Sequence, residues 1–303
     1  MVNLSVDING ITLANPVITA SGTFGYAAEY KDLVDLDSLG GIIVKGLSLK
    51  PCAGNPSPRV VETPCGLLNA VGLENVGVDR FISDKLPFLA TLKPPVFTNI
   101  YGKTIDEYEE LAAIIDTLSG IAGVEVNISC PNVDSGGSAF GVDPETAFNV
   151  VEKIRRATKK HVMVKLSPNV TDIVEIALAV EQAGADSISL INTLTALAID
   201  IKTFKPLLAN VTGGLSGPCV KPVAVRMVWQ VAQKVKIPVI GVGGITNAMD
   251  AIEFIIAGAT AVQVGTATLA DPGVLKNIVK GMESFLKKRG INSISDIRGA
   301  IKV

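Results

Sequence analysis

The chain has 303 residues, of which 48% are hydrophobic and 18% are charged, and its formal net charge is −2. This composition supplies a large buried core, and the lack of a basic block argues against nucleic acid or an anionic membrane surface as the main partner. The aliphatic segments are broken by glycine, proline or charge before they reach the ~20 residues that span a bilayer. Residues 1–10 lack the basic start and apolar run of a signal peptide, so we expect a cytoplasmic protein.

The predicted elements begin with a hairpin and continue as an alternation of strands and helices. Residues 3–14 form two alternating runs that turn at Asn9-Gly10, a pair that tolerates positive φ, and we expect this hairpin to cap one end of the domain. Eight strands are then expected, at residues 16–22, 40–46, 95–102, 123–132, 161–168, 186–193, 238–244 and 261–267.

Between these strands lie helical patterns, in which apolar residues recur three and four positions apart. The predicted helices span residues 104–118, 143–158, 171–184, 221–235 and 247–259. Four of them begin at residue types that favour an N-cap, namely Thr104, Asp143, Thr171 and Asn247.

Eight strands separated by helices predict an α/β fold, a parallel sheet closed into a (β/α)8 TIM barrel, which takes roughly 250 residues as one domain. We expect a single domain over residues 1–303, because no linker divides the chain. An open doubly wound sheet is the alternative, and the lack of a G-x-G-x-x-G motif after the first strand weakens it. Long loops at residues 47–80 and 194–219 follow the carboxyl ends of strands, where barrel enzymes carry their sites, so we expect both loops to be functional.

Polar residues and glycines gather where the predicted strands end. Lys45 and Lys165 each sit in an otherwise aliphatic strand, and a buried ammonium needs an anionic partner, so we expect both to face a negatively charged ligand. Glycines at residues 213–217, 241–244 and 265–266 lie in loops that bind phosphate in barrels through backbone N–H groups. The pattern indicates a phosphate-bearing substrate or cofactor without saying which.

Cysteine and histidine usage narrows the chemistry. The chain has four cysteines and one histidine, and none of the cysteines forms a Cys-x-x-Cys pair, so we expect no metal site. His161 begins a predicted strand, where we expect an exposed structural role. Acid–base chemistry must then use another side chain, and Cys130, at the end of strand 123–132, is the candidate.

The end of this strand also carries the most specific motif. The sequence NISCPN at residues 127–132, followed by GG-x-AFG at residues 136–141, resembles the dihydroorotate dehydrogenases, in particular the bacterial NAD-linked subclass. Further motifs resemble the same family in the same order: ASGTFG (20–25), NPSPR (55–59), LNAVGLEN (68–75), VKLSPN (164–169), NVTGGLSGP (210–218) and GVGGI (241–245). The tetrapeptide Ser-Cys-Pro-Asn alone is also similar to dihydropyrimidine dehydrogenases.

The resemblance implies an FMN-containing barrel that oxidises dihydroorotate to orotate in de novo pyrimidine (UMP) biosynthesis. Cys130 resembles the base that removes the C5 proton while a hydride leaves C6 for the flavin, and residues 131–141 resemble a lid that excludes water. The substrate-binding residues that it implies are Lys45, Asn69, Ala70, Val71, Gly72, Leu73, Asn127, Asn192 and Thr193. The FMN-binding residues that it implies are Ser21, Lys45, Gly46, Asn99, Asn127, Lys165, Ile191, Gly217, Gly243, Gly244, Gly265 and Thr266.

The same resemblance implies where the electrons go. The NAD-linked subclass uses a second subunit with FAD and a [2Fe–2S] cluster, in a heterotetramer of two catalytic and two electron-transfer chains. This chain has no NAD fingerprint and no cluster ligands, which fits that division and fits equally a fumarate-using homodimer. The quinone-linked subclass is disfavoured. The resemblance implies that this subclass has a serine at the position of Cys130 and a membrane-associated N-terminal extension.

Two further hypotheses keep the barrel. One is a flavin-free lyase or isomerase, in which Lys45 or Lys165 forms a Schiff base with a phosphorylated substrate. The other is a non-catalytic binding barrel, which leaves Cys130 and both lysines without a purpose.

Overall fold

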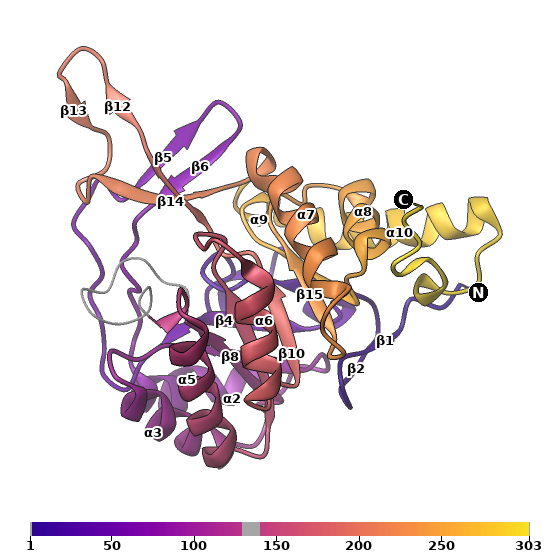
Figure 1. The fold of residues 1–303 in the computed structure, drawn as a ribbon, viewed down its shortest axis with the longest axis horizontal. Coiled ribbons are helices and arrows are strands. Elements are labelled where there is room, and N and C mark those ends of the chain that lie inside the picture. Colours follow the sequence, from indigo (N-terminus) through magenta and orange to yellow (C-terminus); the bar gives the residue numbers. More distant parts are fainter. Residues whose placement is uncertain (1, 129–139, 303) are drawn as a thin grey trace.

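The core of the molecule is a parallel eight-stranded sheet, which confirms the predicted (β/α)8 barrel (Figure 1). The structure, a computed structural model, describes residues 2–128 and 140–302. Neighbouring strands pair in the order β3-β16-β15-β10-β9-β8-β7-β4, and each overlaps its predicted range. The strands are β3 (Val17–Thr19), β4 (Ile42–Leu47), β7 (Val96–Ile100), β8 (Gly123–Asn127), β9 (His161–Leu166), β10 (Ser187–Leu190), β15 (Val239–Val242) and β16 (Ala261–Val264).

The barrel closes between β3 and β4. An isolated parallel bridge pairs Ile18 with Gly41. The Thr19 hydroxyl donates to the carbonyl of Ile43 (3.2 Å) and accepts from its backbone N–H (2.9 Å). Because closure places the carboxyl ends of all eight strands around one opening, residues that follow different strands can meet there.

Helices surround the sheet on the outside (Figure 1). The long ones are α3 (Ile105–Asp116), α5 (Pro144–Ala157), α6 (Ile173–Gln182), α7 (Lys221–Ala232), α8 (Ala248–Ala257) and α10 (Val274–Arg289), of which only α10 was not predicted. Shorter helical segments are η1 (Ala28–Tyr30), η2 (Leu36–Ser38), α1 (Val78–Arg80), η3 (Phe81–Lys85), α2 (Leu86–Leu89), η4 (Pro218–Val220), α9 (Ala267–Ala270) and η5 (Ile294–Ile297). Within the described ranges, none of the helices combines the length and apolarity needed to cross a membrane.

Three of the four predicted N-caps are confirmed. The side chains of Thr104, Asp143 and Asn247 each accept a backbone N–H in the first turn of their helix. The prediction of Thr171 was wrong, because α6 begins one residue later and the carboxylate of Asp172 accepts from the N–H of Val174 (2.8 Å). Aspartate and threonine are both good caps, so only the backbone path selects between neighbours.

The N-terminal hairpin is confirmed and covers the amino-terminal end of the barrel. Strands β1 (Val6–Asp7) and β2 (Thr12–Leu13) pair antiparallel, and the turn between them holds Asn9 and Gly10 at φ 57° and 93°. The Asn9 amide lies 3.5 Å from the carboxylate of Asp186, the residue before β10. This contact places the hairpin at the face opposite the strand carboxyl ends.

His161 lies beneath this hairpin, and the prediction that it is exposed was wrong. Its side chain is only 6% exposed, and its Nε2 atom lies 2.7 Å from the Ser187 hydroxyl. The ring also packs edge-on against Phe97. A residue that begins a barrel strand is buried here because the hairpin closes that end.

The two segments expected to be long loops contain an antiparallel sheet. Strands β5 (Val60–Thr63) and β6 (Gly66–Asn69) come from the first segment, and β11 (Leu194–Leu197) and β14 (Thr212–Ser216) come from the second. They pair in the order β11-β14-β6-β5, and together with the hairpin of β12 (Ile199–Asp200) and β13 (Lys205–Pro206) they project to one side of the barrel (Figure 1). We call this projecting sheet, residues 60–69 and 194–216, the arm.

Candidate active site

Three neighbouring strands bring predicted site residues together at the carboxyl end of the barrel. Asn127 ends β8 and is in register with Lys165 on β9. Asn192 follows β10, and its Nδ2 atom lies 3.4 Å from Oδ1 of Asn127. The Tyr108 hydroxyl donates to the carbonyl of Asn127 (2.8 Å), so α3 holds the end of β8 in place. Amides can both donate and accept, which suits the edge of a heterocyclic ring.

Lys165 is buried at this end of the barrel, with 5% exposure. Its ammonium donates to the Ser21 hydroxyl (3.1 Å) and lies 4.0 Å from a carboxylate oxygen of Glu125. Part of the negative charge that its burial requires is therefore supplied by the chain itself. An ammonium has three N–H donors, so a donor remains for a ligand beyond these two contacts.

Glu125 was missed by sequence reasoning. It is completely buried in the middle of β8, and its two oxygens accept from Asn99 Nδ2 (2.7 Å), the Ser189 hydroxyl (2.8 Å) and Gln263 Nε2 (2.6 Å). The sequence feature that could have revealed it is the glutamate in GVEVN. Its two valine neighbours are buried on one face of the strand, and alternation places the acid on the other face. A fully buried acid needs partners, and its presence in an apolar strand was a reason to search for them.

The predicted substrate segment, residues 69–73, begins at the end of β6 in the arm. The Asn69 amide donates to the carbonyl of Gly214 (3.2 Å), and the Asn55 amide donates to the carbonyl of Ala70 (2.9 Å). Gly72 has φ 75°, and a Cβ there would lie 2.5 Å from Asn55 Cγ, so only glycine permits this close approach. Val71 accepts the N–H of Asn55 (3.0 Å), which completes the anchoring of the segment.

A second anchor for this segment is Asn75, which sequence reasoning did not assign. Its Nδ2 atom donates to the carbonyl of Leu73 (2.9 Å) and to the Tyr101 hydroxyl (2.8 Å), and its Oδ1 atom accepts the N–H of Gly77 (2.9 Å). Burial raises the pKa of Tyr101, so this hydroxyl stays protonated. Leu73 is held at φ 58°, an unusual value for a leucine, which indicates that the anchors impose its conformation.

The glycine-rich loops after β14, β15 and β16 lie close together. Gly217 and Gly244 have φ 96° and 72°, and a Cβ on Gly244 would lie 2.8 Å from the carbonyl oxygen of Gly217. The Thr266 hydroxyl donates to that of Ser216 (2.8 Å), which joins the loop after β16 to the same place. These loops follow β14, β15 and β16, and their backbones approach more closely than side chains would allow, which suits a phosphate held by backbone N–H groups.

Contacts also place the remaining predicted residues. The Cβ position of Gly46 lies 3.2 Å from Asn99 Oδ1, and that of Gly243 lies 3.4 Å from Ile191. A Cβ on Gly214 of β14 would lie 2.1 Å from the Thr193 hydroxyl oxygen, and a Cβ on Gly265 would lie 3.3 Å from Ala20. Lys45 is half-buried on β4, and among the described residues no hydrogen bond or ion pair joins its ammonium to the Lys165 cluster.

Cys130 and most of the predicted lid fall on residues 129–139, outside the described part of the chain. The flanking residues are described. Ile128 is buried after β8, and Phe140 packs edge-on against Tyr108 with a ring separation of 5.8 Å. Because the Tyr108 hydroxyl also holds Asn127, one side chain of α3 contacts both flanks of this segment.

The fold and the contacts define a (β/α)8 barrel with a polar, glycine-lined site at the carboxyl ends of its strands. The family model for dihydroorotate dehydrogenase matches residues 3–286. The chain therefore belongs to the dihydroorotate dehydrogenase family.

Close relatives cover the whole chain. It is 59% identical to the dihydroorotate dehydrogenase B (NAD(+)) catalytic subunit of Geotalea daltonii, over 99% of both chains. It is 60% identical to the protein of the same name from Geobacter sulfurreducens, over 99% of both chains, and 60% identical to that of Geotalea uraniireducens, over 99% of this chain and 98% of the relative.

Proposed function

We propose that this chain is the catalytic subunit of an NAD+-linked dihydroorotate dehydrogenase, which oxidises dihydroorotate to orotate in pyrimidine biosynthesis. The observation that carries the proposal is the identity of 59–60% along the full length to proteins named for this activity. The cluster of Asn127, Lys165 and Asn192 at the barrel opening supports it, because it offers amide and ammonium groups to a planar, anionic ring system. We propose that residues 1–303 act as one FMN-binding barrel domain in the cytoplasm.

The site residues fit FMN at both of its ends. The close backbone approach at Gly217 and Gly244, with Gly243, Gly265 and Thr266 beside them, suits the phosphate and ribityl chain. Ser21, Gly46, Asn99, Lys165 and Ile191 would surround the flavin ring, and Lys45 and Asn127 would contact both the flavin and the substrate. Bound FMN supplies the acceptor for the hydride that leaves C6 of dihydroorotate.

The chain's own residues would bind the substrate and move the proton. Lys45 suits the substrate carboxylate, and the amides of Asn69, Asn127 and Asn192 suit the ring edge, with residues 70–73 and Thr193 completing the contact surface. Cys130 would take the proton from C5 as the C6 hydride leaves, so that the C5–C6 bond becomes double. Residues 131–141 would exclude water during this step.

A partner subunit would complete the electron path. We propose a heterotetramer of two copies of this chain and two electron-transfer chains that carry FAD and a [2Fe–2S] cluster and reduce NAD+. The words "catalytic subunit" in the relatives' names support a division of labour between chains.

The deciding test mixes the purified chain, loaded with FMN, with dihydroorotate under anaerobic conditions. We expect the visible flavin absorbance to bleach, and we expect neither NAD+ nor fumarate to restore it in the absence of a partner. Recovery with fumarate alone would identify the homodimeric subclass instead. A chain that binds no FMN and is trapped by borohydride in the presence of a phosphorylated carbonyl compound would favour the Schiff-base lyase.

A further inference from the structure

The carboxylate of Glu125 lies in the barrel interior, against Asn99 and Lys165 of the proposed flavin-binding set. Glu125 is on β8, and the groups around it come from β7, β9, β10 and β16, so five of the eight barrel strands meet at this side chain. Packing alone does not need a charge there, because apolar side chains normally fill barrel interiors. A fully buried carboxylate is costly unless it is paired and hydrogen-bonded, so its function must be sought in its partners.

One partner is an amide at the site. The amide nitrogen of Asn99 donates to the Glu125 carboxylate (2.7 Å). That contact turns Oδ1 of Asn99 the other way, toward Gly46, whose Cβ position lies 3.2 Å from it. Glu125 therefore determines which atom of Asn99 faces Gly46, a residue of the proposed flavin-binding set.

The other partner is an ammonium at the site. Lys165 is almost fully buried, and its Nζ atom lies between the Ser21 hydroxyl (3.1 Å) and Glu125 (4.0 Å). In a low-dielectric interior the carboxylate strongly affects how much positive charge the ammonium presents to a ligand. Ser189 and Gln263 hold the carboxylate in position and carry no charge of their own.

We propose that Glu125 is a positioning residue for the flavin reaction: its carboxylate orients Asn99 and Lys165, and its negative charge offsets the ammonium, so that it limits how strongly the site favours reduced FMN. This inference rests on the proposed FMN binding. Reduction adds negative charge to the flavin ring, and an ammonium that faces the ring stabilises that charge. The carboxylate behind the ammonium weakens this stabilisation.

The first test is the midpoint potential of bound FMN in Glu125→Gln, measured by anaerobic equilibration with a reference dye. The variant keeps the shape of the side chain and removes its charge. We expect a more positive potential, with at least a tenfold higher ratio of reduced to oxidised FMN at a fixed dye potential, which is about 30 mV for a two-electron couple. A ratio within threefold of the wild-type value, or a shift to a more negative potential, would overturn the proposal.

Two control variants separate charge from structure. Ser189→Ala removes a hydrogen bond to the same carboxylate and leaves every charge in place, so its potential should stay within threefold of the wild type. Glu125→Asp keeps the charge and should likewise stay close to the wild type. Equal shifts in Ser189→Ala and Glu125→Gln would mean that disturbed packing, and not the carboxylate charge, sets the potential.

A second test needs no flavin and covers the case in which Glu125→Gln does not retain FMN. Glu125→Gln and Lys165→Met each leave a buried charge without its counterpart, whereas the double variant is neutral. We expect the double variant, without FMN, to unfold at a higher urea concentration than either single variant. If the stability lost in the double variant equals the sum of the losses in the two single variants, the pairing of these two residues would be overturned. Failure of the wild-type chain to bind FMN would instead refute the proposed function and would leave this urea comparison intact.

Discussion

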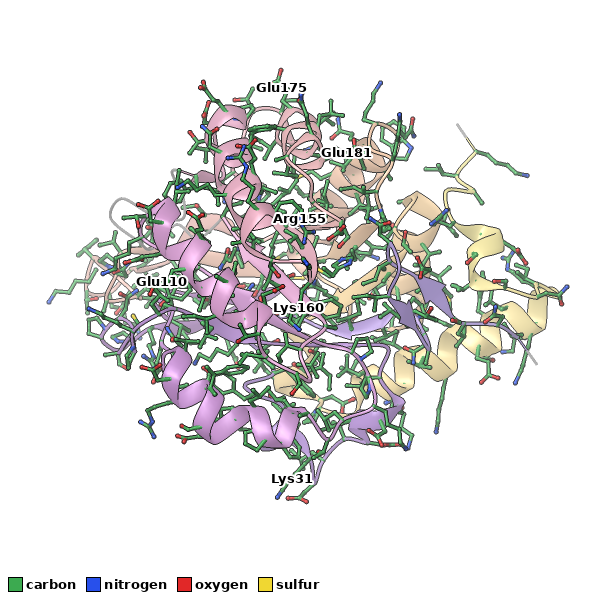
Figure 2. The ribbon with its side chains drawn as sticks, turned by 90° about the horizontal axis from the view of Figure 1, so that it is seen from below. Lys31, Glu110, Arg155, Lys160, Glu175 and Glu181 are labelled. Carbon is green, nitrogen blue, oxygen red and sulfur yellow. The ribbon has the colours of Figure 1, made fainter. Side chains whose placement is uncertain are left out.

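Buried ionisable side chains lie at both ends of the barrel. Toward the carboxyl end, Lys165 and Glu125 lie 4.0 Å apart at the candidate site. At the amino-terminal end, burial lowers the pKa of His161 to about 4, and the nearby Asp186 opposes this effect while Arg155 adds to it. Figure 2 shows Arg155 near Lys160, whose carbonyl accepts from the guanidinium (2.9 Å). The two ends thus differ in role: one can bind a ligand, and the other stabilises the fold.

His161 should make the stability of the protein depend on pH between about 4 and 6.5. Its pKa in the folded protein is lower than in the unfolded chain, so the unfolded chain binds more protons in this window. The contribution of His161 to the free energy of unfolding is fully present above pH 6.5 and is lost as the pH falls toward 4. At 1.36 kcal/mol per pKa unit, the total is on the order of 3 kcal/mol. The charged groups near the ring are Asp186, Arg155 and Asp7.

The check is urea unfolding at pH 7.5 and pH 4.5 for the wild type and for His161→Gln. We expect the wild type to lose more stability than the variant between these pH values, since carboxylates elsewhere affect both proteins equally. Ser187→Ala, which removes the hydroxyl at 2.7 Å but keeps the imidazole, should retain the wild-type pH dependence. Equal pH dependence in the wild type and His161→Gln would contradict the prediction.

Cys130→Ser should lose turnover without losing the ligand. A serine hydroxyl is a far weaker base than a thiolate, so we expect the rate of flavin reduction by dihydroorotate to fall by roughly 10²–10⁴-fold. Orotate binding, measured by the change in the flavin spectrum, should stay within a few fold of the wild type. Cys65→Ser, at an exposed cysteine in the turn between β5 and β6, is the matched control and should react normally. Full activity in Cys130→Ser would remove Cys130 from the mechanism.

Among the elements, the glycine loops and the arm illustrate two ways of building a site. The loops after β14, β15 and β16 contain glycines, which have no side chain, so backbone groups can approach one another and a ligand. The arm works by pairing, because β6 and β14 hydrogen-bond to each other and carry Asn69 and the neighbours of Gly217. Both place their residues at the same end of the barrel (Figure 1).

Gly244→Ala tests the phosphate end of the site. The new Cβ would lie 2.8 Å from the Gly217 oxygen at a φ of 72°, so the loop must move. We expect FMN affinity to fall at least tenfold, measured by the fluorescence of released flavin, with a stability loss of about 2 kcal/mol. Gly10→Ala also has positive φ but meets nothing within 4 Å, so it should cost about 1 kcal/mol and leave FMN affinity unchanged. A similar effect on affinity in both variants would argue against a local phosphate site.

At the scale of the whole molecule, barrel closure is what brings the residues of the candidate site together. Hydrogen bonds between the Thr19 hydroxyl and the backbone of Ile43 join β3 to β4. Ser21, just after β3, lies within hydrogen-bond distance of Lys165 on β9. The proposed electron path then leaves the barrel for a second kind of chain, which would reoxidise the site at each turnover.

The oligomeric state should follow from the proposed division between a catalytic chain and an electron-transfer chain. With a chain mass of 31.5 kDa, the protein alone should appear as a dimer by native mass spectrometry. Co-expression with an electron-transfer subunit that carries FAD and a [2Fe–2S] cluster should yield two copies of each chain, and this complex should reduce NAD+ with dihydroorotate. A protein that stays monomeric and turns over NAD+ by itself would contradict the proposed assembly.

The sequence by itself was enough to predict the eight barrel strands, five of the helices, the N-terminal hairpin and the glycine loops, because each depends on local periodicity or on a backbone conformation that few residues permit. Of the candidate site residues, those at strand ends could be singled out from the residue pattern, and others, such as residues 70–73, were named only through the family resemblance. Glu125, the buried state of His161 and the pairing of β6 with β14 could not be predicted in this way. Glu125 accepts from groups 26, 64 and 138 residues away, and β6 and β14 come from segments more than 140 residues apart. Contacts over such separations exist only once the barrel and the arm have folded, so the tertiary structure alone decided them.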